Sequence, residues 1–274
     1  MAFRFRNSAQ NLMSIKRLQK ILCYGLALLP ALLMIPTSQA AGALPERFNA
    51  NYKLSLGPVE LAQMSRKLYR NQQGHFVFES HSRPTGYARW LTSSELKESS
   101  EWILHDGEMR PLHYVYDRSG DKKRHVELKF DWDKQRVTNI INNDPWKMSV
   151  PDGALDKILY HLAVVRDLEL GKEKFEYQIA DGGKLKTVRF EYQGEEVLDT
   201  KLGRFNTIKM YHPGKRKEND TWLWFAKELN HLPVQIQQQK KTGKVMINLQ
   251  SLEGVTPRLE TAVETTKNKR VVVD

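Results

Sequence analysis

Two tryptophans and a nearby group of lysines are the side chains whose spacing best suits ligand binding. Trp222 and Trp224 are two residues apart in a predicted strand, so their rings point to one face. Large rings shed water against an acyl chain or a sugar, and lysines attract an anionic head group. The predicted ligand-binding set adds three lysines of the next hairpin tip, Lys240, Lys241 and Lys244. The alternatives are core packing for the rings and solubilising turn charge for the lysines.

A second pattern resembles the motifs of penicillin-recognising enzymes. Ser94 stands three residues before Lys97, and residues 241–243 read Lys-Thr-Gly. That chemistry needs the serine at a helix start, with its lysine one turn later on the same face. Here residues 241–243 are typical of a hairpin turn, and no Ser-x-Asn motif lies between the two patterns. We therefore expect no enzyme of this kind and name no catalytic residue.

Metal and cofactor chemistry also lacks a pattern. None of the eight histidines belongs to a His-x-x-x-His or His-Glu-x-x-His motif. Cys23 is the sole cysteine, and it lies within an apolar run, so no thiolate site or disulfide is expected. No glycine-rich phosphate loop or dinucleotide motif is present. We expect no metal and no cofactor.

The first forty residues are typical of an export signal. Residues 1–40 contain five lysines and arginines and no acidic residue, and residues 21–35 are almost wholly apolar. Ser38 and Ala40 suit the small-residue positions of signal peptidase, which predicts cleavage after Ala40 and a periplasmic protein. The alternative is an uncleaved single-pass anchor. After cleavage, no integral membrane span is expected.

The net charge of +11 over 274 residues is concentrated partly in that segment. Because the predicted signal removes five positive charges, the remaining excess is modest, and we expect no nucleic-acid partner. Three basic groups remain at predicted hairpin tips, and they indicate a basic rim for anionic lipid head groups or polysaccharide. They are Arg118 with Lys122, Lys123 and Arg124; Lys215, Arg216 and Lys217; and Lys240, Lys241 and Lys244.

Period-two hydrophobicity dominates the rest of the chain. Apolar residues alternate with polar ones in 48–56, and Gly, Asn and Asp turns recur every 8–12 residues. The pattern predicts two separate strands at 184–192 and 196–200, and no strand between residue 141 and the segment 153–169. The segment 153–169 instead has apolar residues at helical spacing, with Asp152 as expected N-cap and Gly171 as expected stop. The pattern predicts a mainly β fold: an antiparallel open barrel, or a curved sheet or sandwich, with this one substantial helix on its concave side.

The domain boundaries follow from the same patterns. No linker interrupts 44–255, which predicts a single β-rich domain. Residues 256–274 lack glycine and a clear period, and we expect a flexible C-terminal tail.

Several stretches resemble an exported bacterial family, domain of unknown function 3108, over about residues 47–253. The matching segments are RFNANY (47–52), GEMRPL (107–112), FDW (130–132), LDK (155–157), YQIADGG (177–183) and GEEVLDTKLG (194–203). Lys201 departs from the family, which usually has a small residue or proline there. The resemblance implies an exported, mostly antiparallel β protein, similar in shape to the open half-barrels of periplasmic lipoprotein carriers, and it implies no activity.

Together these features predict a non-catalytic periplasmic module that binds or carries an amphipathic envelope ligand, either a lipid or an anionic glycan. The alternative is a structural or protein-interaction component of the cell envelope, and a hydrolase of envelope polymers has no support from any motif. The sequence leaves the oligomeric state open.

Overall fold

The structure is a computed structural model that describes residues 44–86, 89, 92–120 and 123–258. The predicted signal (1–40) and most of the predicted tail (259–274) lie outside the described residues. The elements are β1 (Phe48–Leu56), β2 (Val59–Arg70), β3 (Phe76–Pro84), β4 (Leu96–His105), β5 (Glu108–Arg118), β6 (Arg124–Asp131), β7 (Arg136–Ile141), β8 (Asp144–Ser149), β9 (Leu155–Asp156), α3 (Leu159–Glu169), β10 (Phe175–Asp181), β11 (Lys184–Thr200), β12 (Gly203–His212), η1 (Lys217–Asn219), β13 (Thr221–Ala226), η2 (Lys227–Leu229), β14 (Leu232–Lys240) and β15 (Gly243–Glu253).

All the described strands join one sheet, in the order β8-β7-β6-β5-β4-β3-β2-β1-β15-β14-β13-β12-β11-β10-β9. Strands that follow one another in the chain pair side by side and antiparallel, with two exceptions: β9 pairs with β10 in parallel, and β8 and β9 lie at opposite ends of the sheet order. The first and last strands, β1 and β15, pair in the middle of the sheet. This arrangement confirms the predicted mainly antiparallel β fold.

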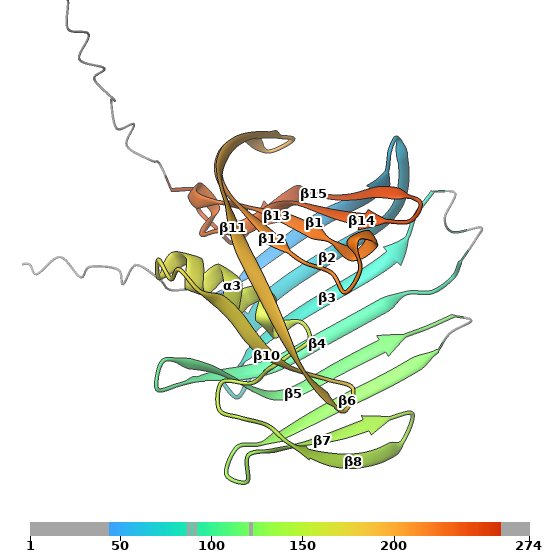
Figure 1. The fold of residues 1–274 in the computed structure, drawn as a ribbon, viewed down its shortest axis with the longest axis vertical. Helices are drawn as coiled ribbons and strands as arrows, with labels where there is room; N and C mark the ends of the chain where they lie inside the picture. The colour runs from blue at the N-terminus through green and yellow to red at the C-terminus, as the bar shows by residue number, and fades with distance from the viewer. Residues whose placement is uncertain (1–43, 87–88, 90–91, 121–122, 259–274) are drawn as a thin grey trace, which may run out of the picture. The chain divides into compact units, whose positions relative to one another are not determined.

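The sheet curls so that its two ends face each other without forming a ladder (Figure 1). The inner face carries the apolar half of each alternating strand: Phe48, Ala50 and Tyr52 of β1 are at most 5% exposed. The helix α3 lies inside the curl, with Leu159 and Leu162 in the same core. The fold is therefore the predicted unclosed, barrel-like sheet with a helix on its concave side.

The helix begins later than predicted. It starts at Leu159, not at residue 153, and Ile158 rather than Asp152 is its N-cap. Asp156 Oδ1 accepts hydrogen bonds from the backbone N–H groups of Ile158 and Leu159, which the first turn of a helix leaves unpaired. Leu155 is buried, but it lies in the short strand β9 and not in the helix. Its burial made the helical spacing of apolar residues seem to begin before the helix does. Gly171, at φ +65°, follows the helix end as expected for a stop.

Two strand predictions also change. β8 was not predicted, because its short sequence opens with Asp144 and Pro145 at the sheet edge. Residues 184–192 and 196–200, predicted as separate strands, form the single strand β11. Its register shifts between Tyr192 and Glu195, so a bulge replaces the predicted break.

Candidate functional site

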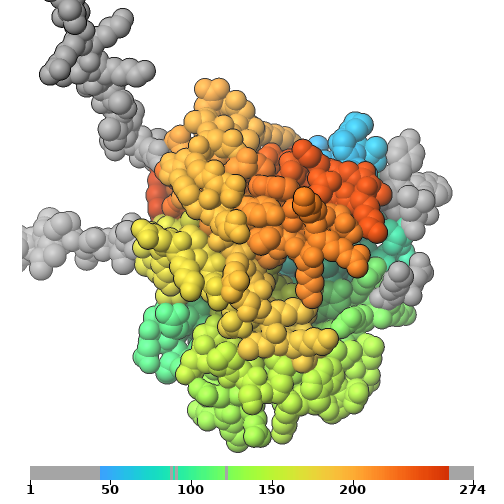
Figure 2. All heavy atoms as spheres, in the orientation of Figure 1, coloured from blue at the N-terminus to red at the C-terminus, as the bar shows by residue number. Residues whose placement is uncertain are grey.

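The two ends of the sheet meet through the turn between β10 and β11, and we call this contact the seam. The backbone N–H of Gly183 donates to Asn139 Oδ1 of β7, at 2.9 Å. Asn139 is fully buried, so its carbonyl oxygen needs such a donor. Figure 2 shows β10 and the start of β11 (yellow to light orange) lying against β7 and β8 (green). A docked turn therefore holds the ends together where a ladder would hold a closed barrel.

Gly183 allows this close approach. Its φ is +85°, and a Cβ on this residue would overlap the indole ring of Trp146 in β8. Both the backbone conformation and the contact thus require a residue without a side chain.

We predict that Gly183→Ala lowers the free energy of unfolding by about 1–2 kcal/mol more than Gly74→Ala does. Gly74 has a similar φ of +80°, but a Cβ on Gly74 would have nothing within 4 Å, so this residue isolates the backbone cost. Urea unfolding of the two variants measures the difference. Equal losses would mean that the Trp146 contact contributes nothing to the seam.

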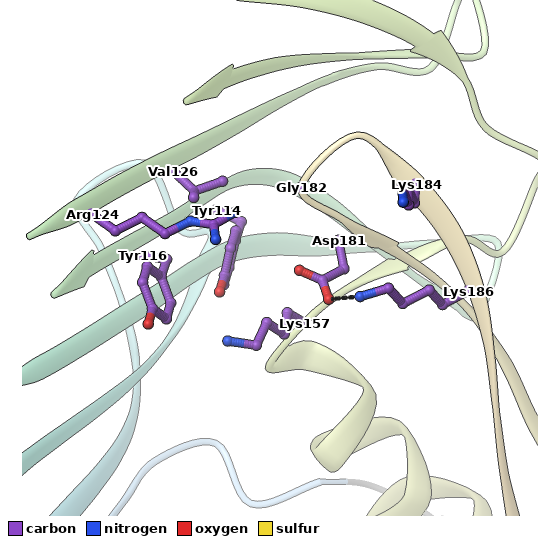
Figure 3. A pocket seen from close by; sticks show the side chains of 9 residues that line it. All are labelled: Tyr114, Tyr116, Arg124, Val126, Lys157, Asp181, Gly182, Lys184 and Lys186. Carbon is purple, nitrogen blue, oxygen red and sulfur yellow. Dashed lines mark hydrogen bonds and ion pairs between the residues drawn. The ribbon is translucent and has the colours of Figure 1, made fainter. Parts of the chain in front are cut away.

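A pocket of about 430 Å³ lies on the inner face beside the seam (Figure 3). One wall comes from β5 and β6, the other from the β10–β11 hairpin, and Lys157 reaches in from the segment before α3. The lining residues are Tyr114, Tyr116, Arg124, Val126, Lys157, Asp181, Gly182, Lys184 and Lys186. Its volume falls within the range of small-molecule sites.

The pocket is predominantly cationic, with four basic side chains against the single carboxylate of Asp181. Lys186 forms an ion pair with Asp181, as the dashed line in Figure 3 marks. Lys157 Nζ lies 3.2 Å from Glu98 Oε1 and 4.3 Å from the centre of the Tyr116 ring. Among the described residues, Arg124 and Lys184 have no carboxylate partner, so they are the cations available to an anion.

Tyr114 supplies a polar group next to these cations. Its hydroxyl donates to Glu98 Oε1 at 2.6 Å. Burial, together with the adjacent Glu98 carboxylate, raises the pKa of the Tyr114 phenol well above its usual range. The phenol therefore stays neutral, and the residues lining the pocket include no serine, cysteine or histidine that would act as a nucleophile or base. The arrangement suits binding of an anionic group beside aromatic surface.

Comparison of the sequence with known families assigns the chain to one of them. The model of DUF3108, a protein family of unknown function, matches residues 47–250. The chain belongs to the DUF3108 family. This confirms the resemblance seen in the sequence and covers every lining residue of the pocket.

A solved structure shares the fold of this DUF3108 protein. The beta-barrel-like protein of domain of unknown function DUF1849 from Brucella abortus aligns with a TM-score of 0.50 at 8% sequence identity. The alignment covers 77% of the present chain and 98% of the Brucella chain. At that identity the likeness concerns the fold alone. None of the curated proteins matches the sequence.

In the DUF3108 domain, the two predicted binding tryptophans lie on the outer face of the sheet. Trp224 pairs with Gln235, which pairs with Asn248, whereas the buried ladder Leu223–Ile236–Ile247 faces inward. Lys209 Nζ lies 4.9 Å from the centre of the Trp224 ring, and the indole N–H of Trp224 donates to Glu196. Trp222, half-buried, contacts Tyr211 at 5.3 Å between ring centres. The two rings do not line the pocket.

The three predicted lysines lie on the β14–β15 hairpin but have different surroundings. Lys240 is paired with Gly243 at the turn, and Lys241 Nζ lies 3.9 Å from Glu218 Oε1. Trp222 pairs with Gln237, which pairs with Met246, so Met246 lies on the outer face with Trp222. Lys244 is two residues before Met246 in β15 and therefore points to the same face. The structure thus places Lys244 and Trp222 on one face, and ligand binding by the five predicted residues stays a prediction.

The described residues of the three predicted basic groups lie at the same end of the strands. In an antiparallel meander alternate turns share one end, and the β5–β6, β12–β13 and β14–β15 turns are all at that end. Arg124 lines the pocket from this end. Lys122 lies outside the described residues. The sequence did not identify six of the lining residues: Tyr114, Tyr116, Lys157, Asp181, Lys184 and Lys186. The available signal was that Tyr114 and Tyr116, and likewise Lys184 and Lys186, are two residues apart in a strand and so share a face.

The remaining motifs have structural roles. Ser94 precedes β4 in a loop and Lys97 lies in β4, so the serine does not begin a helix, and residues 241–242 form the predicted turn. Six histidines each contact a carboxylate, but within the described residues no group of three or more potential ligands could hold a metal ion. No helix in the described part is both long and apolar enough to span a bilayer.

Proposed function

We propose that this DUF3108 protein is an exported, non-catalytic module that binds or carries an amphipathic envelope ligand with an anionic head group. The observation that carries the proposal is the pocket beside the seam, which combines two tyrosine rings with four basic side chains. The unclosed sheet supports this role, because its ends meet through a docked turn and not through a ladder, so a ligand would enter without the opening of a closed barrel.

The two parts of the ligand would have separate contacts. Tyr114, Tyr116 and Val126 offer the apolar surface, where burial of a chain is worth roughly 25 cal/mol per Å². Arg124 and Lys184 would receive the anionic group, because the other lysines already meet Glu98 or Asp181. A planar guanidinium suits an anion with two acceptor oxygens, such as a phosphate or carboxylate.

Export is the second part of the proposal, and it is supported by the basic start, apolar run and small residues of segment 1–40. N-terminal sequencing of the protein recovered from the periplasmic fraction should begin at Ala41. A full-length chain confined to the cytoplasm would contradict the export and the envelope role together.

We predict that Arg124→Gln/Lys184→Gln weakens binding of dodecyl phosphate by about tenfold or more at low salt, equal to about 1.4 kcal/mol. Binding of the neutral dodecyl maltoside should change little, because its contacts are with the rings. Isothermal titration calorimetry below the micelle concentration measures both. The matched control is Lys147→Gln/Lys174→Gln, which removes two exposed charges away from the pocket.

A third variant, Lys240→Gln/Lys241→Gln/Lys244→Gln, tests the site predicted from the sequence. If only this variant weakens dodecyl phosphate, the head group lies at the β14–β15 tip and the pocket assignment is wrong. If wild-type protein binds neither detergent saturably, the carrier role fails. The structural or protein-interaction role then replaces it, and native mass spectrometry would detect a partner protein instead of a lipid.

A further inference from the structure

A separate groove of about 750 Å³ lies on the outer face of the sheet, away from the seam pocket. It crosses β15, β1, β2 and β3, and Lys201 reaches it from the β11–β12 turn. The outward positions of these strands align across the ladders: Asn51 pairs with Ser65, and Ser65 pairs with His81. The groove is therefore built from the polar half of four strands whose apolar half forms the core.

Its charge is strongly positive. Lys53, Lys67, Arg83 and Lys201 line it, and within the described residues none of the four forms an ion pair with a carboxylate. The acidic residue in the lining, Glu60, accepts hydrogen bonds from Thr85 Oγ1 at 2.7 Å and from Gln63 Nε2 at 3.3 Å. Most other charged side chains on the outer face of β3–β6 are paired, as His81 is with Glu95 at 2.9 Å. Four cations without a carboxylate partner in one groove are suited to several anionic groups along a chain.

The polar side chains between the cations suit hydroxyl groups. The groove contains amides and hydroxyls from Asn49, Asn51, Gln63, Gln250, Ser65 and Ser251. Asn51 Nδ2 donates to Ser251 Oγ at 3.0 Å, which leaves the Asn51 carbonyl oxygen as an acceptor for a ligand donor. Amide groups of this kind both donate and accept, as sugar hydroxyls do.

No aromatic ring is offered to the groove by the described residues. Tyr52 contributes to the lining but is 2% exposed, and its hydroxyl donates inward to the Pro233 carbonyl oxygen at 3.0 Å. Single-stranded nucleic acid is bound largely by stacking on aromatic rings, and amphipathic helices bind membrane surfaces by burying an apolar face. Cations interleaved with amides and hydroxyls, without either feature, favour a hydrophilic acidic chain.

We propose that this outer groove binds an acidic polysaccharide, with carboxylates of successive sugars at the four cations and hydroxyls at the amides. This is a second site, independent of the inner pocket and of an amphipathic ligand. Lys201 lines the groove from the β11–β12 turn, so it would contribute a cation from outside the four strands.

The test uses the protein purified from the periplasmic fraction and polygalacturonate as the probe, with dextran as the neutral polymer. Lys53→Gln/Lys67→Gln/Arg83→Gln should weaken polygalacturonate binding at least about tenfold at low salt, and raising the salt should weaken wild-type binding. The matched control Arg136→Gln/Lys147→Gln/Lys174→Gln removes the same charge from exposed positions elsewhere and should bind within about twofold of wild type. Circular dichroism checks that both variants fold.

Lys201→Gln alone should give a smaller loss, and Arg124→Gln/Lys184→Gln should give none. The proposal is overturned if wild type does not bind polygalacturonate saturably, or if the control variant loses as much affinity as the groove variant. It is also overturned if double-stranded DNA or phosphatidylglycerol vesicles bind the groove more tightly than polygalacturonate. These outcomes do not depend on whether the inner pocket binds dodecyl phosphate.

Discussion

Replacing Leu162 by alanine should lower the free energy of unfolding by about 2–5 kcal/mol. Leu162 is 2% exposed, and its neighbours on α3, Leu159 and Val165, are buried as deeply. The helix fills the concave side of the sheet, so the removed methyl groups leave a cavity that the surrounding strands cannot easily close. Urea unfolding followed by circular dichroism measures the loss.

Leu170→Ala is the matched control, because Leu170 directly follows the helix and is 44% exposed. Its cost should stay within about 0.5 kcal/mol. If Leu162→Ala costs as little as that control, α3 does not fill the core, and the sheet must be stable without it.

Removing the charge of Asp156 should change how stability depends on pH. Asp156 is completely buried, and burial raises the pKa of its carboxyl from 3.8 to about 6. The folded protein therefore binds the proton more tightly than the unfolded chain. The resulting stabilisation is fully present below pH 3.8 and is lost as the pH rises through 6, a change of about 3 kcal/mol.

Asp156→Asn should abolish that change, because asparagine is neutral at every pH. Its carbonyl oxygen can still accept from Ile158 and Leu159, and its amide can donate to Ser100, which now donates to Asp156. The difference in unfolding free energy between variant and wild type, measured from about pH 4 to 7, should grow in favour of the variant with rising pH.

Comparing the variant with wild type separates the effect of Asp156 from that of carboxyl groups whose pKa values are lowered in the folded protein. Hydrogen bonds from histidines lower the pKa values of Glu95 and Glu101, so their contribution is lost as the pH falls. They are unchanged in the variant. Asp152→Asn, an exposed position, is the control. Parallel stability curves for wild type and Asp156→Asn would show that the buried carboxyl does not change its protonation in this range.

The strands were predictable because apolar and polar residues alternate along them, and the apolar ones are the side chains that the core buries. The helix start was not, because Leu155 and Asp156 pair with β10 residues 179–180, and a local pattern does not contain that pairing. The spacing of the apolar residues correctly predicted which of them are buried. It wrongly assigned Leu155 to the helix instead of to β9.

The pocket was harder to predict than the fold. Both faces of β13 are apolar, so alternation did not say whether Trp224 or Leu223 points inward. The ladder settles it, and Trp224 is covered on the outer face by Lys209 and Glu196 instead of by a second layer. Tyr114, Lys157 and Lys184 come from three separate segments, and only the curl of the sheet brings them together.

The pairing of β1 with β15 also constrains the order in which this sheet can be completed. Among the described strands, the other antiparallel ladders join neighbours in the chain and can form as soon as each hairpin has been made. β1 is synthesised before them all, yet one of its edges finds its partner only when residues 245–253 have been made. Until then that edge offers unpaired backbone groups to any other extended chain. The growing polypeptide thus carries an open strand edge from its first hairpin to its last.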